Sequence, residues 1–114
     1  MMNFTQRKPK QGQIYLMAVE YRDRPNIKKA RPVVVVSNER ATDIDVIAVS
    51  VSSQLKRSEY DVSINYWKEC GLSRPSIART SKLLSVSSQQ LQTYLGKLDA
   101  TDLNRIIEKC KDVF

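Results

Sequence analysis

The 114-residue chain contains no histidine, and it has only two cysteines and three glycines. The absence of histidine excludes a Ser-His-Asp triad, acid–base catalysis by imidazole and most zinc sites. Any catalysis must therefore use arginine, lysine, carboxylate, tyrosine, serine, threonine or cysteine side chains. Cys70 and Cys110 have no metal-ligand spacing and form no disulfide framework, so we expect two reduced thiols packed as small apolar side chains.

Long apolar runs are also missing, because no segment approaches the ~20 residues that a transmembrane helix requires. The opening sequence Met-Met-Asn-Phe-Thr-Gln-Arg-Lys lacks the apolar core of a signal peptide. We therefore expect a cytoplasmic protein that does not bind a membrane. The length predicts a single domain, with residues 1–11 as a flexible basic arm and residues 12–114 as the folded part.

Acidic residues are few, with 12 against 19 lysines and arginines, and the formal net charge is +7. An excess of positive charge attracts polyanions and accelerates their capture. The charge alone does not distinguish RNA, DNA and an acidic protein as the partner. The carboxylates are scattered rather than clustered as metal ligands would be, so we expect no metal and no cofactor.

The most informative stretch is Lys-Lys-Ala-Arg-Pro-Val-Val-Val-Val-Ser-Asn at residues 28–38. Successive valines suit a strand that is buried on both faces, and we predict this strand over residues 32–37. Pro32 lacks an N–H group and is placed at the first residue of the strand. Arg31 then ends a cationic loop over residues 21–30. A guanidinium fixed beside a packed strand is suited to bind a phosphate. The other cations of this loop are Arg22, Arg24, Lys28 and Lys29.

Further strands are predicted from β-branched and alternating segments. We expect them at 13–20, 44–51, 60–64 and 75–80, and residues 82–86 either continue the last strand or pair with it. Ser87 is expected to cap a short turn. Residues 92–97 fit either a strand or a helix end.

The C-terminal segment predicts a helix, because its apolar residues recur on one helical face. Asp99 or Thr101 is the expected N-cap, and Asp102 suits the positive end of the helix dipole. Short strands followed by one helix predict a small barrel or a curled antiparallel sheet with a helix. The apolar face contains Leu103, Ile106, Ile107, Cys110, Val113 and Phe114.

The order of several segments resembles the MazF/PemK (Kid) family of toxins from type II toxin–antitoxin systems. These segments begin at Gly12 (Gly-Gln-Ile-Tyr), at Arg31 (Arg-Pro-Val-Val-Val-Val-Ser-Asn), at Ile47 (Ile-Ala-Val-Ser-Val-Ser-Ser-Gln), at Gly71 (Gly-Leu-Ser-Arg-Pro-Ser-Ile-Ala-Arg-Thr-Ser-Lys) and at Leu95 (Leu-Gly-Lys-Leu). The resemblance implies a mainly β fold with a C-terminal helix, in the form of an SH3-like or CcdB-like small β-barrel that forms a homodimer. It also implies a metal-independent, sequence-specific endoribonuclease for single-stranded RNA, and a cognate acidic antitoxin that blocks the site.

The resemblance also assigns site residues. The catalytic arginine before the proline of the buried strand corresponds to Arg31, the threonine of a Thr-x-Gln pattern to Ser52, and an arginine of the PemK branch to Arg79. The aspartate that this branch carries two residues after its arginine is replaced by Ser81. Glu20, the carboxylate at the end of the strand that precedes the cationic loop, is the candidate general base. The candidate substrate-binding residues are Lys28, Lys29, Gln54, Lys56, Ser81 and Lys82.

Two other classes of function remain open at this point. A CcdB-like gyrase poison would share the barrel but inhibit a protein; that branch depends on a C-terminal Trp-Gly-Ile, whereas this chain ends in Asp-Val-Phe. A non-catalytic nucleic-acid-binding barrel would use the same basic loops without an ordered pair of Arg31 and Ser52. The loop before Arg31 lacks the family's common Gly-Ser-Glu-Gln sequence, so the RNA recognition sequence is not predicted.

Overall fold

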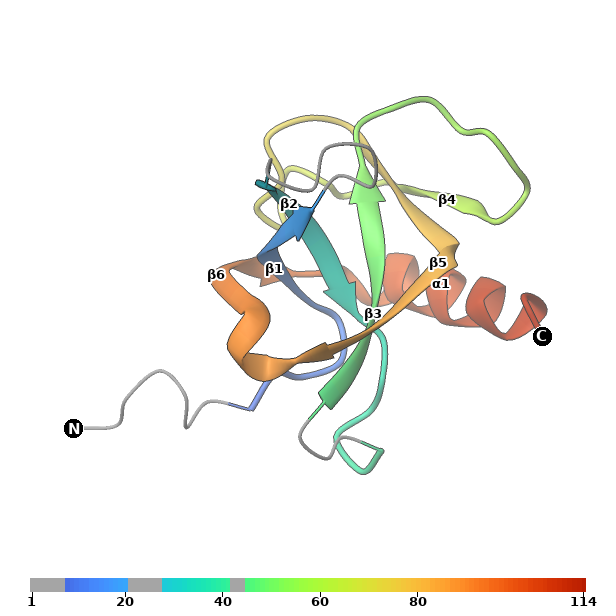
Figure 1. The fold of residues 1–114 in the computed structure, drawn as a ribbon. Helices are drawn as coiled ribbons and strands as arrows, with labels where there is room; N and C mark the ends of the chain where they lie inside the picture. The colour runs from blue at the N-terminus through green and yellow to red at the C-terminus, as the bar shows by residue number, and fades with distance from the viewer. Residues whose placement is uncertain (1–7, 21–27, 42–44) are drawn as a thin grey trace.

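The computed structural model describes residues 8–20, 28–41 and 45–114, which form one antiparallel sheet and a C-terminal helix (Figure 1). The sheet has the strand order β4-β5-β3-β2-β1-β6. The prediction of a mainly β fold with a terminal helix is therefore confirmed. The elements of the described residues are β1 (Gln13–Glu20), β2 (Lys28–Val35), β3 (Asp45–Ser52), β4 (Asp61–Ile64), β5 (Ser76–Ser87), the 3-10 turn η2 (Ser88–Gln90), β6 (Leu91–Lys97) and α1 (Ala100–Asp112).

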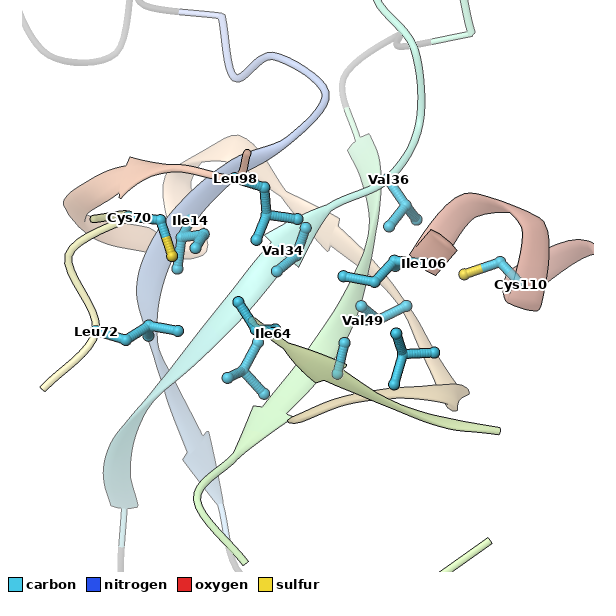
Figure 2. Packing of buried hydrophobic residues seen from close by; sticks show 13 residues of the cluster. Ile14, Val34, Val36, Val49, Ile64, Cys70, Leu72, Leu98, Ile106 and Cys110 are labelled. Atoms are coloured by element: carbon cyan, nitrogen blue, oxygen red, sulfur yellow. The ribbon is translucent and has the colours of Figure 1, made fainter. Parts of the chain in front are cut away.

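The valine run separates two apolar cores, one on each face of the sheet. Val34 and Val36 belong to the first core, which also contains Ile106 and Cys110 of α1 (Figure 2). Val33 and Val35 belong to the second core, whose other buried members come from β1, β3, β5 and β6. All four valines are buried, as predicted from a sequence that cannot alternate between core and solvent. The remaining buried members of the second core are Tyr15, Met17, Val46, Ala48, Val86 and Leu91.

Strand β2 begins earlier than the sequence predicted. It starts at Lys28 rather than at Pro32, so Lys28 and Lys29 pair with β1 instead of lying in a loop. Pro32 is consequently inside the strand, opposite Leu16 of β1. The pairing of β2 with β3 runs only from Val33 to Val35, so Pro32 lies where β2 is bonded to one neighbour. A missing N–H is tolerated at such an edge-like position. The rest of the predicted cationic loop, with Arg22 and Arg24, lies outside the described residues.

The two edge strands, β4 and β6, are connected without pairing to each other. The turn after β4 lies against β6, because a Cβ added at Gly71 would be 2.2 Å from the carbonyl oxygen of Leu95 and one at Gly96 would be 2.3 Å from that of Cys70. Gly71 also has φ +91°, a value that side-chain-bearing residues rarely adopt. In the described part of the chain, strand pairing leaves the sheet open between β4 and β6. Gly71 and Gly96 allow the backbone of the turn after β4 to contact the backbone of β6 directly.

The C-terminal elements agree with the predictions, except at the end of the helix. Residues 82–86 continue β5, residues 92–97 form most of β6, and Ser87 caps η2 in a capping box. Asp99 is the N-cap of α1 and accepts hydrogen bonds from the N–H and the hydroxyl of Thr101, which lower the pKa of the Asp99 carboxyl. The helix ends at Asp112, and Phe114 is 94% exposed rather than part of the apolar face.

The residues before β1 are partly attached to the sheet. The side-chain amide of Gln11 donates a hydrogen bond to the carbonyl of Val36, at 2.8 Å. The N–H of Gly12 donates to the carbonyl of Val35, at 2.7 Å. Residues 8–11, the described part of the predicted basic arm, therefore lie at the end of β2. No helix in the described part of the chain is long and apolar enough to cross a membrane.

The two cysteines are free and buried, as predicted. Burial raises the pKa of both thiols, so both stay protonated at neutral pH, and a protonated thiol is a poor nucleophile. We expect iodoacetamide to label neither Cys70 nor Cys110 appreciably in the native protein at pH 7.5. Two labels per chain should appear by mass spectrometry after unfolding in guanidinium chloride. Rapid labelling of the native protein would contradict this packing.

Candidate active site

Several candidate residues meet where strand β3 ends. Ser50 of β3 is opposite Arg79 of β5, and Arg79 is opposite Asp61 of β4, so the three residues form one row across three strands. Ser52 lies in the next row of the same face, opposite Ile77. Directly opposed residues of an antiparallel pair have their Cβ atoms about 4.5–5.5 Å apart. The register therefore brings Ser52 and Arg79, far apart in the sequence, to neighbouring rows.

Arg31 lies on the same face through strand β2. The register of β2 with β3 places Val33 opposite Ser50, and Arg31, two residues earlier on β2, lies on the same face just beyond the last β2–β3 pair. On its other side Arg31 is opposite Met17 of β1. Its side chain is half-buried. The sheet thus places Arg31, Ser52 and Arg79 on one face at one end of the central strands.

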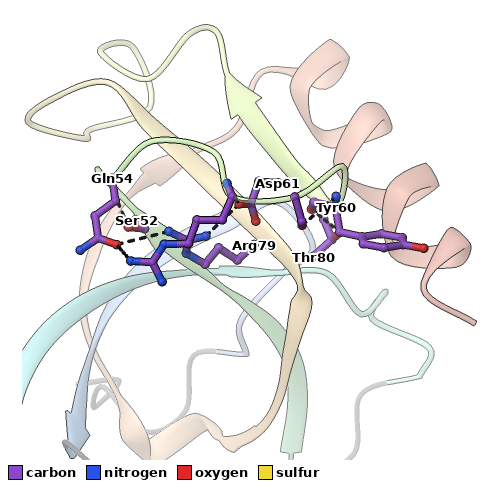
Figure 3. A network of polar contacts seen from close by, with 8 residues as sticks. Ser52, Gln54, Tyr60, Asp61, Arg79 and Thr80 are labelled. Carbon is purple, nitrogen blue, oxygen red and sulfur yellow. Dashed lines mark hydrogen bonds and ion pairs between the residues drawn. The ribbon is translucent and has the colours of Figure 1, made fainter.

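Arg79 is held by a buried carboxylate (Figure 3). Its Nη1 donates to Oδ2 of Asp61 at 2.8 Å, and the side chains of Arg79 and Asp61 are 13% and 2% exposed. The same Asp61 oxygen accepts the backbone N–H of Arg57 at 2.8 Å. Asp61 therefore orients the Arg79 guanidinium and also holds the backbone of the loop that follows β3.

Gln54 extends this network toward Ser52. Its side-chain oxygen accepts hydrogen bonds from Nη2 of Arg57 at 2.5 Å and from Nη2 of Arg79 at 3.4 Å. Its backbone N–H donates to the Ser52 hydroxyl oxygen at 3.1 Å. Because that oxygen acts as the acceptor, the Ser52 O–H can still donate its proton to a bound group. These hydrogen bonds join five residues into one polar cluster: Ser52, Gln54, Arg57, Arg79 and Asp61.

Asp61 and Arg57 are the two members of this cluster that sequence reasoning missed. The family pattern has an aspartate two residues after its arginine, whereas this chain has Ser81 at that position. The structure supplies a carboxylate from the adjacent strand β4. The alternation at residues 60–64 predicted that strand, but it contained no signal for the register that sets Asp61 opposite Arg79. Arg57 is not among the residues that the sequence assigned to the site.

Ser81 and Lys82 lie in an irregularity of β5 and not in the row of Arg79. The partner of Ser50 is Arg79 and that of the preceding residue, Val49, is Leu83, so residues 80–82 have no partner on β3. Ser81 and Lys82 are exposed. Thr80 is buried, and its hydroxyl donates to the carbonyl of Tyr60 at 2.6 Å. The bulge anchors β5 to the segment before β4 and turns the next two side chains to solvent.

The remaining candidates surround the cluster or lie away from it. Lys56 is exposed on the loop that carries Arg57, and Lys29 is exposed on β2. Glu20 and Lys28 are opposite each other where β1 ends and β2 begins, three residue pairs from Arg31. The side chains of Glu20 and Lys28 lie outside the described residues. The structure therefore does not place the candidate base relative to Arg31. In the described ranges, no three His, Cys, Asp or Glu side chains gather in a way that could hold a metal ion.

This arrangement is suited to binding and stabilising negative charge. Arg31 and Arg79 lie on the two strands that flank β3, which carries Ser52, and Arg57 lies on the loop that follows β3. Guanidinium groups bind phosphate oxygens through directed pairs of hydrogen bonds. A buried carboxylate keeps one of them in place before any ligand arrives. The site has the chemical character of a phosphate-binding surface.

Residues 10–114 match the family described as the PemK-like, MazF-like toxin of type II toxin-antitoxin system. The chain therefore belongs to this toxin family, as its sequence motifs predicted. Comparison with curated protein sequences gives no match.

Solved structures of similar fold include endoribonucleases and a MazE–MazF complex. An endoribonuclease in complex with its cognate antitoxin from a mycobacterial species has a TM-score of 0.76 at 22% identity, over 93% of this chain and 94% of that chain. An endoribonuclease from a mycobacterial species has a TM-score of 0.74 at 20% identity, over 92% and 89% of the two chains. A MazE–MazF crystal structure (Form-III) from Deinococcus radiodurans has a TM-score of 0.73 at 17% identity, over 92% and 94%. At these identities the likeness shows the fold.

Proposed function

We propose that this toxin is a metal-independent endoribonuclease that cleaves single-stranded RNA at specific short sequences. The observation that carries the proposal is that Arg31, Ser52 and Arg79 lie on one face at one end of the sheet, in a chain that belongs to the PemK/MazF-like family. Similar folds are named as endoribonucleases. The positively charged surface fits a polyanionic substrate.

The proposed reaction uses the 2′-hydroxyl of RNA as its own nucleophile. A base removes the 2′-proton, the 2′-oxygen attacks the adjacent phosphorus, and the bond from phosphorus to the 5′-oxygen breaks. The departing 5′-oxygen takes up one proton, so the products are a 2′,3′-cyclic phosphate and a 5′-hydroxyl. Negative charge grows on the two non-bridging phosphoryl oxygens, and preorganised donors there stabilise the transition state. Glu20 remains the candidate base.

The roles of the site residues follow from this charge distribution. Arg31 and Arg79 stabilise the phosphoryl oxygens, and Ser52 donates its hydroxyl proton to one of them. Fixed guanidinium groups supply the positive charge that other nucleases take from metal ions. The flanking phosphates are bound by the outer cations and polar groups. These are Lys28, Lys29, Gln54, Lys56, Ser81 and Lys82.

The proposal extends to the partners and the shape of the toxin. Two of the similar structures are complexes of a toxin with its antitoxin, one of them MazE with MazF. We propose that a cognate acidic antitoxin covers the basic site of this chain, that the toxin acts as a cytoplasmic homodimer, and that residues 12–114 form its domain. The sheet, with its edges joined through Gly71 and Gly96, fits an open form of an SH3-like or CcdB-like barrel.

Cleavage of end-labelled single-stranded RNA in the presence of EDTA tests the proposed function. We expect discrete products that end in a cyclic phosphate, and no product from RNA with a 2′-deoxy sugar at the cleavage site. Activity that vanishes in EDTA and returns with Mg²⁺ would contradict the mechanism. Tight RNA binding without any cleavage would favour a non-catalytic nucleic-acid-binding protein, and inhibition of gyrase without RNA cleavage would favour a gyrase poison.

A further inference from the structure

Arg57 and Arg79 share a single uncharged acceptor. The side-chain oxygen of Gln54 accepts from Nη2 of each arginine, at 2.5 and 3.4 Å, so the two nitrogens are no farther apart than the sum of these distances. Two guanidinium groups at this separation repel each other. A neutral amide oxygen between them orients both groups but cancels neither charge. The pair is therefore preorganised for an anion that can contact both groups.

The only acid in the hydrogen-bond network described above is Asp61. Its Oδ2 contacts Nη1 of Arg79 and the backbone N–H of Arg57, and it leaves the Arg57 guanidinium bonded to Gln54. Within this network the Asp61 carboxylate is therefore ion-paired with Arg79 alone, and no carboxylate contacts the Arg57 guanidinium. Arg57 is exposed, whereas the Arg79 side chain is largely buried, so an anion would approach from the side of Arg57.

The arginine pair lies directly beside the proposed site of cleavage. The same Gln54 that bonds both arginines donates its backbone N–H to the Ser52 hydroxyl oxygen. Since Arg79 also belongs to the proposed catalytic set, an anion bound by the pair would be the phosphoryl group at Ser52 itself, with Arg57 as an additional contact. RNA presents a regular series of phosphates, so the ligand that fits is a phosphate diester of the bound strand.

We propose that Arg57 and Arg79 together bind one phosphate of the RNA, and that Asp61 and Gln54 are positioning residues that hold the two guanidinium groups for it. This inference rests on the proposed function and deepens it. It assigns the anchoring of Arg79 to Asp61 of strand β4, and it adds Arg57 to the residues that contact RNA. The hydrogen-bonded guanidinium pair supplies directed contacts to phosphate oxygens, which a mobile lysine does not.

The test measures binding of an RNA analogue in which 2′-deoxy sugars prevent cleavage, by fluorescence anisotropy at several salt concentrations. Arg57→Ala is expected to weaken binding about tenfold, the loss of one charge-assisted contact, and to reduce the salt dependence by about one phosphate equivalent. Arg40→Ala is the matched control, because Arg40 is exposed in the turn after β2, away from the end of β3. Equal effects of the two variants would overturn the assignment of Arg57.

The role of Asp61 is tested by the sign of its effect. Asp61→Asn removes a negative charge, so a purely electrostatic role predicts tighter RNA binding. A positioning role predicts the opposite: about tenfold weaker binding and a lower kcat, because Arg79 loses its anchor. Glu59→Gln is the control, since Glu59 is an exposed carboxylate of the same loop. Tighter binding by Asp61→Asn, matching Glu59→Gln, would overturn the positioning role.

Coupling to Arg79 separates positioning from a general loss of structure. In an Arg79→Ala background, Asp61→Asn should no longer weaken binding of the 2′-deoxy analogue, because its effect passes through the missing side chain. An equal weakening in both backgrounds, with a lowered melting temperature, would show that Asp61 only supports the fold. A wild type that binds the analogue but cuts no RNA would contradict the proposed function and leave the phosphate site standing. Wild-type cleavage with no loss in either Arg57→Ala or Asp61→Asn would overturn the site alone.

Discussion

Alanine in place of Arg31 is expected to reduce the rate of RNA cleavage by about 10³–10⁵, the range that a well-placed arginine contributes to phosphoryl transfer. Arg31 lies on the stretch of β2 that pairs with β1 alone, just beyond the last β2–β3 pair. Its side chain is half-buried and belongs to neither apolar core. The loss should therefore appear in kcat with single-stranded RNA, while circular dichroism and the melting temperature stay near those of the wild type.

Arg31→Lys separates charge from geometry. Lysine keeps one positive charge but lacks the planar fork of donors, so we expect most of the catalytic loss to remain. Arg40→Ala, which removes an exposed arginine from the turn between β2 and β3, should cleave RNA at the wild-type rate. Near wild-type activity of Arg31→Ala would show that the arginine before the valine run does not contact the reacting phosphate.

Local patterns were sufficient to predict most elements of this fold. Four consecutive valines require burial on both faces, and the structure divides them between two cores. The Ser87 capping box and the Asp99 cap are also local, since each depends on neighbouring residues in the chain. Pro32 was misleading because a proline typical of a strand start is equally tolerated where a strand has one bonded neighbour. The start of β2 was therefore placed too late.

The candidate site was only partly predictable, because strand register decides which side chains meet. Arg31, Ser52 and Arg79 were assigned from motifs, and the sheet places them on one face. Asp61 was not assigned, although it lies within hydrogen-bonding distance of Arg79. A shift of one residue between β4 and β5 would turn Asp61 to the opposite face. That register is fixed by contacts between residues 18 positions apart, which no local pattern records.

The bulge in β5 gives Ser81 different surroundings from those of the same position in a regular strand. A regular strand would place residue 81 on the same face as Arg79 and close to it. In the structure, residues 80–82 are unpaired with β3, and Ser81 is exposed. The sequence contained the spacing of the family pattern but not the irregularity that changes where the side chain points. A carboxylate from β4 fills the place beside Arg79.

Asp102 has a role in the structure beyond the one that its sequence position suggested. Its place in the first turn of α1 suggested an interaction with the helix dipole. The structure shows it completely buried, where its two oxygens accept the backbone N–H groups of Asn65 at 3.2 Å and Tyr66 at 2.9 Å. Arg105 donates to Asp102 at 3.3 Å. The carboxylate thereby ties α1 to the turn that follows β4.

Asp102→Ala is expected to lower the free energy of unfolding by about 3–5 kcal/mol, because it removes two hydrogen bonds to a charged acceptor, each of which contributes about 1.5–3 kcal/mol. The substitution leaves two backbone N–H groups without their acceptor and frees the Arg105 guanidinium. Guanidinium chloride unfolding measures the effect. Asp112→Ala is the control, because its ion pair with Lys109 is at the surface with an N–O distance of 3.8 Å and should change stability by less than about 1 kcal/mol. Equal stability of the two variants would mean that water or another side chain replaces the Asp102 carboxylate, and that α1 is held to the sheet by its apolar face alone.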